Sequence, residues 1–243
     1  MKKDPKGFYY FPRFRDQRVI NGVSTKNFGN MSLKFGDKTE VVKNRVNFLD
    51  CLGTKTSFAQ PDLIHGTKVD IVDEVGIYAE TDALVTNVKG LPLLLLTGDC
   101  LPIMFFDPTQ EIIGLAHAGY LGSIGKIGNS VIEKMISKFN VRAQDILIGI
   151  GPCIQACCYV NRRPVLQEKL PEWQKYLTVI SDDEVIVDLV EFNISQFVGL
   201  GVKRRNIFIG PCTKDQSDEF FCSQNETAGI DKPGRFASVI MIQ

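Results

Sequence analysis

The chain has 243 residues and a mass of 27.1 kDa, which is enough for one large domain with a buried core. Twenty-eight Lys and Arg balance 28 Asp and Glu, so the formal net charge is zero. This balance argues against a protein that binds nucleic acid or an anionic membrane through its overall charge. We expect neither of these partners, and we expect a monomer or a weak homo-oligomer.

The first residues, Met1–Phe14, are partly basic but carry no continuous apolar run, so they predict no export signal. The chain has seven cysteines and no Cys-x-x-Cys pair. An odd number of thiols without an export signal is typical of a reducing compartment, where thiols stay free. We therefore expect a cytoplasmic protein without a disulfide framework.

Short apolar or β-branched runs separated by Gly, Pro and Asp predict strands. These runs are Lys68–Val72, Asp82–Thr86, Pro92–Thr97, Pro102–Phe106, Glu111–His117 and Asp145–Ile150. The most apolar stretch, Leu91–Phe106, contains two prolines and Asp99. It is shorter than the roughly 20 residues of a membrane-spanning helix, so we interpret it as two buried strands.

Between Ser123 and Phe139 the apolar residues recur every three or four positions, which predicts a helix, and Asn140 is a suitable C-terminal cap. A second helix is expected at about Asp188–Val198. The fold class predicted from these elements is α+β. We expect a single mixed α/β layered domain over residues 1–243, with an extended β-sheet core flanked by helices.

Two helix–strand segments of the chain have a weakly similar sequence pattern. Each helix is followed by an apolar strand and then by Gly-Pro-Cys, ending at Cys153 in the first unit and at Cys212 in the second. The similarity is explained either by two units that share the same turn chemistry or by an internal duplication.

The candidate chemistry lies at strand ends. Both histidines of the chain, His65 and His117, adjoin glycine turns, and Cys100 interrupts the apolar stretch after Asp99. Two imidazoles and a thiolate suit a catalytic Zn²⁺ with one open coordination position. The same three residues also suit a Cys–His nucleophile pair. Taken singly, His65 and Cys100 are better explained by a structural role in a turn.

The order of the motifs resembles the laccase-domain, or multicopper polyphenol oxidoreductase, family, which includes the YfiH- and YlmD-like proteins. The resemblance covers almost the whole chain. The matching segments are NGVSTKNFGNMSL, Gly36-Asp37, VVKNR, IHGTKV, TDALVTN, LLLTGDCLPIMFFD, IIGLAHAGY, IGIGPCI and the terminal Pro233-Gly234-Arg235.

The resemblance implies one Zn²⁺ held by His65, Cys100 and His117, which would also be the catalytic residues. It implies phosphorolysis of adenosine, inosine and methylthioadenosine, with nucleoside and phosphate as small-molecule partners, and adenosine deamination. Tyr120 and Arg235 are the expected substrate-binding residues. Copper is not expected, because two histidines cannot supply the imidazoles of a multicopper cluster.

Two other readings remain open. Some YfiH-like relatives act as amidases in peptidoglycan-precursor editing, and Cys100 with a histidine base would suit such a hydrolase. Alternatively, the chain is a degenerate, non-enzymatic zinc-binding member of the family.

The chain also departs from the family pattern. Leu121 replaces an arginine that is suited to an oxyanion, and Val160 replaces a glutamate. Ser223 is followed by Gln224 and Asn225 where arginines are usual. Arg162, Arg163 or Arg235 would have to supply the missing charge.

The remaining cysteines of the middle segment, Cys153, Cys157 and Cys158, are interpreted as small buried thiols rather than metal ligands.

Overall fold

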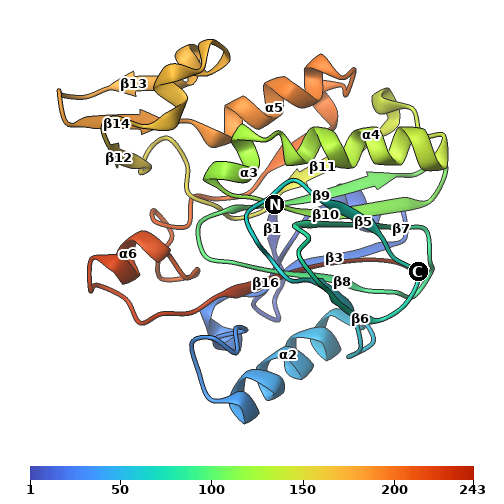
Figure 1. Ribbon diagram of the computed structural model, residues 1–243. Coiled ribbons are helices and arrows are strands. Elements are labelled where there is room, and N and C mark those ends of the chain that lie inside the picture. The colour runs from blue at the N-terminus through green and yellow to red at the C-terminus, as the bar shows by residue number, and fades with distance from the viewer.

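Two β-sheets packed face to face form the centre of the molecule, and helices cover the outer face of each (Figure 1). The computed structural model describes residues 1–243. The seven-stranded sheet has the order β1 (Lys2–Lys3), β2 (Tyr9–Tyr10), β3 (Val19–Val23), β16 (Phe236–Ile242), β8 (Leu93–Thr97), β4 (Ala59–Pro61) and β6 (Gly76–Tyr78). The six-stranded sheet has the order β15 (Ile207–Ile209), β11 (Leu147–Ile150), β9 (Leu101–Asp107), β10 (Ile112–Ala118), β7 (Ala83–Thr86) and β5 (Val69–Ile71).

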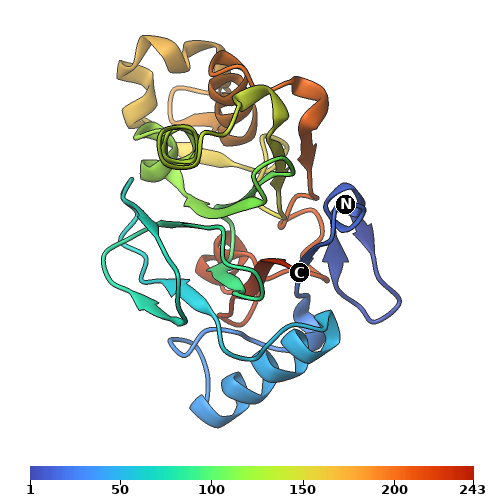
Figure 2. The ribbon, with the colours of Figure 1, turned by 90° about the vertical axis from the view of Figure 1, so that its right-hand side faces the viewer.

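The helices form the two outer layers. Helix α2 (Lys38–Leu52) covers the seven-stranded sheet, whereas α4 (Ile127–Phe139) and α5 (Leu189–Gly199) cover the six-stranded sheet (Figure 2). The shorter helices are α1 (Pro12–Arg15), α3 (Tyr120–Ile124) and α6 (Ser223–Thr227). A small third sheet, β12 (Val160–Arg162), β14 (Glu184–Val187) and β13 (Leu177–Val179), lies beside them. None of the helices is long and apolar enough to cross a membrane.

Three apolar clusters hold these layers together. Twenty buried residues lie between the two large sheets, 30 lie mainly between the six-stranded sheet and its helices, and eight lie under α2. Every residue of β9 and β10 is buried, because both faces of these strands are covered. The layered α/β architecture with an extended sheet core confirms the predicted fold class.

Local sequence signals set the ends of the main helices. The side chain of Asp37 accepts hydrogen bonds from the backbone N–H groups of Thr39 and Glu40 at the start of α2. The side chain of Asp188 accepts one from the N–H of Glu191 at the start of α5. Asn140 ends α4 in the left-handed conformation, with φ of 57°, as its cap position predicts.

The predicted helix over Ser123–Phe139 is wrong in one respect, because it is two helices. Lys126 has a φ of 61° and separates α3 from α4. A left-handed residue cannot continue a right-handed helix, so the axis changes direction there. Helix α3 consequently stays over the end of β10, next to the candidate site, while α4 packs along the sheet.

The apolar stretch Leu91–Phe106 forms two buried strands, as predicted, but the strands belong to different sheets. Strand β8 lies in the seven-stranded sheet and β9 in the six-stranded sheet. The turn at Gly98-Asp99-Cys100 therefore carries the chain from one sheet to the other. Polar groups in this turn reach the edge between the two sheets instead of being sealed in the core.

The two Gly-Pro-Cys segments lie side by side. Strands β11 and β15 pair in parallel, with Ile150 opposite Ile209, and Cys153 forms an isolated parallel bridge with Cys212. The backbone N–H of Thr213 donates to the carbonyl oxygen of Cys153 over 3.0 Å. The two similar segments therefore pair with each other in one sheet. This pairing is compatible both with shared turn chemistry and with an internal duplication.

Candidate metal and active site

The structure brings His65, Cys100 and His117 together at the edge between the two large sheets. Their possible ligand atoms all lie within 4.8 Å of one another. The two imidazole rings have centroids 4.8 Å apart and are nearly perpendicular, at 84°. His117 is the penultimate residue of β10 and lies opposite Pro102 of β9, so the sheet register places it next to the turn that carries Cys100.

Asp82 orients both histidines. One carboxylate oxygen, Oδ1, lies 2.9 Å from Nδ1 of His117 and accepts the backbone N–H of His65, also at 2.9 Å. The other, Oδ2, accepts the N–H groups of Gly66 at 2.7 Å and Ile64 at 3.3 Å. Asp82 is fully buried, and this hydrogen bonding directs Nε2 of His117 toward Cys100. A carboxylate behind a histidine is a recurrent support for a metal ligand.

His65 is held in a conformation that side chains rarely adopt. Its φ is 61°, in the left-handed region, and its residue is exposed. The three backbone N–H groups of the His65 turn that bond to Asp82 maintain this conformation. Such local strain is typical of functional positions.

Gly119 leaves the space in which the three side chains meet. A Cβ atom at this position would lie 2.9 Å from Sγ of Cys100. It would also lie 3.5 Å from the ring of His65 and 3.6 Å from that of His117. The backbone therefore forms one wall of the cluster, and any larger residue would intrude into it.

The electrostatics of the cluster favour a charged pair. Burial alone would raise the pKa of the Cys100 thiol, but hydrogen bonds with His117 and His65 lower it to about 6. Burial alone would lower the pKa of His117, but hydrogen bonds with Asp82 and Cys100 raise it to about 9. In the absence of a metal, the pair is therefore thiolate and imidazolium near neutral pH.

Asp99 fastens the turn that carries Cys100. Its Oδ1 accepts the hydroxyl of Thr213 over 2.6 Å, and its Oδ2 accepts the backbone N–H of Gln224 over 2.9 Å. The thiol of Cys222 also contacts Oδ2, at 3.6 Å. Burial raises the pKa of Asp99, although these hydrogen bonds oppose the shift. Asp99 thus connects the turn between the two sheets to the segments of Thr213 and Gln224.

A cavity of about 350 Å³ adjoins the cluster. Its walls include His65, Cys100 and His117 together with Phe35 and Arg235. Cavities of this size hold small molecules such as nucleosides. The guanidinium of Arg235 lies 4.4 Å from the ring centroid of Phe35 and pairs with Glu226 over 2.9 Å. Arg235 is thus positioned from two sides at the wall of the cavity.

Comparisons of the sequence and of the structure with known proteins all identify the same family. The family model described as multi-copper polyphenol oxidoreductase laccase matches residues 17–243. The chain belongs to this family. It is 28% identical over 255 residues to the purine nucleoside phosphorylase YlmD of Bacillus subtilis, covering 93% of this chain and 89% of that protein. It is 35% identical over 136 residues to a purine nucleoside phosphorylase of Deinococcus radiodurans, covering 55% and 53%.

Solved structures of the family show the same fold. YlmD from Geobacillus stearothermophilus superposes with a TM-score of 0.91 at 26% identity, covering 100% of this chain and 98% of that one. The hypothetical protein YfiH of Bacillus licheniformis gives 0.90 at 26% identity, covering 99% and 98%. The sequence resemblance to the YfiH- and YlmD-like proteins is therefore confirmed.

The positions that depart from the family pattern lie around the cavity rather than in it. Leu121 lies on α3 and is 50% exposed, and Val160 is exposed on β12. Gln224 accepts from Nζ of Lys214 over 3.3 Å, and Asn225 is buried and donates to Asp231 over 3.4 Å. The two residues after Ser223 thus have structural partners of their own.

Tyr120 does not line the cavity beside His117. Its hydroxyl accepts the backbone N–H of Leu166 over 2.8 Å, and its ring lines a separate hollow with Tyr159 and Arg162. Stacking of Tyr120 on a purine stays a prediction, and it would require a ligand that reaches this second hollow.

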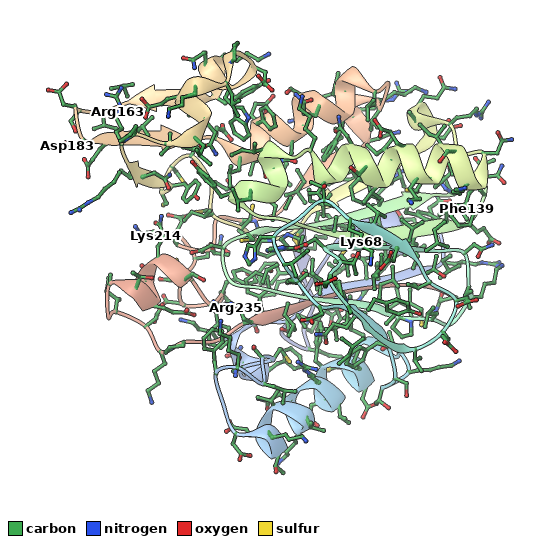
Figure 3. All side chains as sticks on the ribbon, viewed as in Figure 1. Lys68, Phe139, Arg163, Asp183, Lys214 and Arg235 are labelled. Atoms are coloured by element: carbon green, nitrogen blue, oxygen red, sulfur yellow. The ribbon has the colours of Figure 1, made fainter.

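Of the candidate arginines, only Arg235 is at the cavity. Arg163 lies at the small sheet, next to Asp183, whereas Arg235 lies near α6 (Figure 3). Arg163 pairs with Glu168 over 3.0 Å, and Arg162 lines the neighbouring hollow. Neither of them lines the cavity.

The expectation of three small buried thiols is wrong for two of them. Cys153 is fully buried, but Cys157 is exposed and Cys158 is half-buried. They follow β11 in an irregular loop at the surface, so no strand or helix covers them.

Asp82 belongs to the candidate site, although the sequence motifs did not single it out. It appears in the sequence only as the second residue of TDALVTN, at the start of a predicted strand. A carboxylate next to a run of buried apolar residues must find a partner, and this was the available signal. Which partner it finds depends on the pairing of β7 with β10, which places the N–H of His117 2.8 Å from the carbonyl oxygen of Asp82.

Proposed function

We propose that this protein is a zinc-dependent purine nucleoside phosphorylase. The observation that carries the proposal is the convergence of His65, Cys100 and His117 on one point beside a cavity whose wall includes Arg235. Two named relatives with this activity, YlmD of Bacillus subtilis and that of Geobacillus stearothermophilus, support it at 28% identity each.

The three residues suit Zn²⁺ as a donor set. The cluster offers two imidazole nitrogens and one thiolate, and it contains three members, so a fourth position remains for water or substrate. The Asp82 carboxylate behind His117 and the adjoining cavity suit such a site. A multicopper centre does not fit, because the chain has only two histidines.

When bound, Zn²⁺ would supply Lewis-acid polarisation of the substrate. In phosphorolysis, an oxygen of phosphate forms a bond to C1′ of the ribose while the bond from C1′ to the purine nitrogen breaks. Arg235 would bind the phosphate, because a guanidinium matches an oxyanion with two parallel N–H donors. Glu226 and Phe35 would hold that guanidinium in place. Asp82 would keep His117 and the His65 turn in position throughout.

The experiment combines zinc content with turnover. Protein purified without added metal is expected to hold one more zinc per chain than Cys100→Ala, and Cys51→Ala, at a half-buried cysteine on α2, is expected to hold as much zinc as the wild type. Inosine, adenosine and methylthioadenosine are then each incubated with and without phosphate. Phosphate-dependent release of the base by wild type and not by Cys100→Ala supports the proposal. Zinc-loaded protein that converts none of the three nucleosides refutes it. Deamination of adenosine is read from the same samples as formation of inosine.

One observation favours a second candidate, a thiol hydrolase or amidase. The thiol of Cys100 and a ring nitrogen of His117 lie within 4.8 Å of one another, and their mutual hydrogen bond lowers the pKa of Cys100 and raises that of His117, as in a Cys–His nucleophile. An electrophilic thiol probe distinguishes the two functions. Rapid labelling of Cys100 that persists in zinc-loaded protein and disappears in His117→Ala supports the hydrolase. Protection of Cys100 by zinc supports the phosphorylase.

A further inference from the structure

A second group of thiols lies outside this site. Sγ atoms of Cys157, Cys158 and Cys212 all lie within 4.8 Å of one another. Cys157 and Cys158 come from the loop after β11, and Cys212 comes from the segment after β15. The parallel bridge between Cys153 and Cys212 brings these two segments together. The phosphorylase proposal does not account for three converging thiols, of which Cys157 is exposed, Cys158 half-buried and Cys212 buried.

The backbone around Cys212 is arranged to receive a thiolate. The N–H groups of Asp215, Gln155 and Lys214 all donate to its sulfur. Burial alone would raise the pKa of Cys212, but these donors and the thiol of Cys157 lower it. The side-chain amide of Gln155 also donates to the carbonyl oxygen of Gly210 over 2.8 Å, which fixes the first loop against the second. Backbone donors on a cysteine sulfur orient it and hold negative charge there.

The spacing of the three sulfurs fits a single cation. Three sulfurs about 2.3 Å from one ion are about 3.8 to 4.0 Å from one another, in tetrahedral or trigonal geometry. The observed separations of up to 4.8 Å need an adjustment of about 1 Å or less, and Cys157 is exposed and free to make it. The geometry therefore requires only small side-chain movements.

The donor set and the neighbouring charge define the class of ion. The group contains only sulfur, with no imidazole and no carboxylate, and such sets select soft cations such as Zn²⁺ or Cu⁺ over Mg²⁺ or Ca²⁺. The ammonium of Lys214 acts favourably on the thiolate of Cys158. Three thiolates around a divalent ion leave one net negative charge, which Lys214 offsets.

We propose that Cys157, Cys158 and Cys212 form a second, independent site for a thiophilic cation, with Zn²⁺ as the ion to test. On binding, each thiol that is protonated loses its proton to solvent and forms one bond to the metal. The bound ion would fasten the loop of Tyr159 to the segment of Thr213. Because Thr213 donates to Asp99, the ion would also support the turn that carries Cys100.

The test counts zinc in reduced protein and separates the two sites. Wild type is expected to bind two Zn²⁺ per chain. The double variant Cys157→Ser/Cys158→Ser and the single variant Cys100→Ala are each expected to bind one. Cys51→Ser, on α2, is the matched control and keeps two. If the double variant does not fold, Cys157→Ser alone is used, because that side chain is exposed.

Labelling identifies the sulfurs directly. In Cys100→Ala protein, Cd²⁺ or Zn²⁺ is expected to protect Cys157 and Cys158 from a maleimide, as read by peptide mass mapping, while Cys51 stays reactive. Absence of protection, or a double variant with the same zinc content as wild type, overturns the proposal. A disulfide between two of the three that forms in the presence of excess Zn²⁺ also overturns it. If Cys100→Ala loses one zinc and the double variant loses none, only the phosphorylase site is supported. If the double variant loses one zinc, the second site is supported whatever Cys100→Ala shows.

Discussion

The carboxylate of Asp82 holds both histidines of the candidate site. Its Oδ1 is 2.9 Å from Nδ1 of His117 and 2.9 Å from the backbone nitrogen of His65. Burial alone would raise the pKa of Asp82, but the hydrogen bonds from His117 and Gly66 lower it, so the group is ionised. One buried charge therefore links the start of β7, the end of β10 and the turn that precedes β5.

Replacing Asp82 by Asn is expected to weaken zinc binding by about 10- to 100-fold, because the amide offers only one acceptor and no charge behind His117. Competition with a chromophoric chelator measures this affinity. Asp70→Asn is the matched control, since Asp70 is on the adjacent strand β5 and pairs only with Lys68 at the surface. Equal affinities of the two variants would show that Asp82 does not orient the ligands.

Replacing Gly119 by Ala is expected to remove the zinc held by His65, Cys100 and His117, and with it the nucleoside turnover, while the protein remains folded. The new Cβ would lie 2.9 Å from Sγ of Cys100, which is too close for an unshifted side chain. Gly199→Ala serves as the control, because a Cβ there meets nothing within 4 Å. Circular dichroism and metal analysis of both variants provide the comparison, and a fully zinc-loaded Gly119→Ala would contradict the proposed geometry.

In metal-free protein, alkylation of Cys100 by iodoacetamide is expected to rise with pH around a midpoint near 6, well below an ordinary thiol. The lowered pKa means that the thiolate contributes stability above the ordinary value of 9.0, and that this contribution is lost as pH falls through about 6. The pKa of His117 is raised, so its imidazolium stabilises the folded protein at low pH, and this stabilisation is lost as pH rises through about 9.

Asp82→Asn should move the Cys100 midpoint upward, because a less basic His117 stabilises the thiolate less. Rates measured from pH 5 to 9, with the labelled peptide identified by mass, test both statements. A midpoint that stays near 9 in the wild type would contradict the thiolate–imidazolium pair.

His65→Gly is expected to be more stable than His65→Ala in the presence of a chelator, by about 1 kcal/mol. The position has a φ of 61°, which glycine adopts freely and alanine does not. Urea denaturation of the two variants measures the difference. Equal free energies of unfolding would mean that the turn relaxes once the imidazole is removed.

Arg235→Lys and Arg235→Ala are expected to raise the KM for phosphate by about tenfold or more and to affect the KM for nucleoside less. A single ammonium does not reproduce the two parallel donors of a guanidinium. Arg205→Ala, at an exposed position beyond α5, is the control. Steady-state kinetics with each substrate varied in turn measure the two KM values. If Arg235 only holds Glu226 in place, the KM for phosphate and the KM for nucleoside would rise equally, which would contradict phosphate binding by Arg235.

The sequence by itself determined the ligand candidates and part of the elements, whereas α2, β3 and β16 were not predicted. Alternating and continuous apolar runs predicted β5, β7, β8, β9, β10 and β11 close to their observed bounds, because buried strands need apolar residues wherever they lie. The three residues His65, Cys100 and His117 stood out because chemistry-bearing side chains beside glycine turns are visible locally. The observed fold class agrees with these signals.

Tertiary structure alone decided how these pieces combine. That β8 and β9 belong to different sheets, that Asp82 faces His117, and that Cys212 meets Cys157 and Cys158 all follow from long-range strand pairing. The break between α3 and α4 depends on the left-handed Lys126, which the periodic spacing of the apolar residues does not predict. Hydrophobic periodicity reports whether a residue is buried, whereas the identity of its neighbour depends on segments that are distant in the chain.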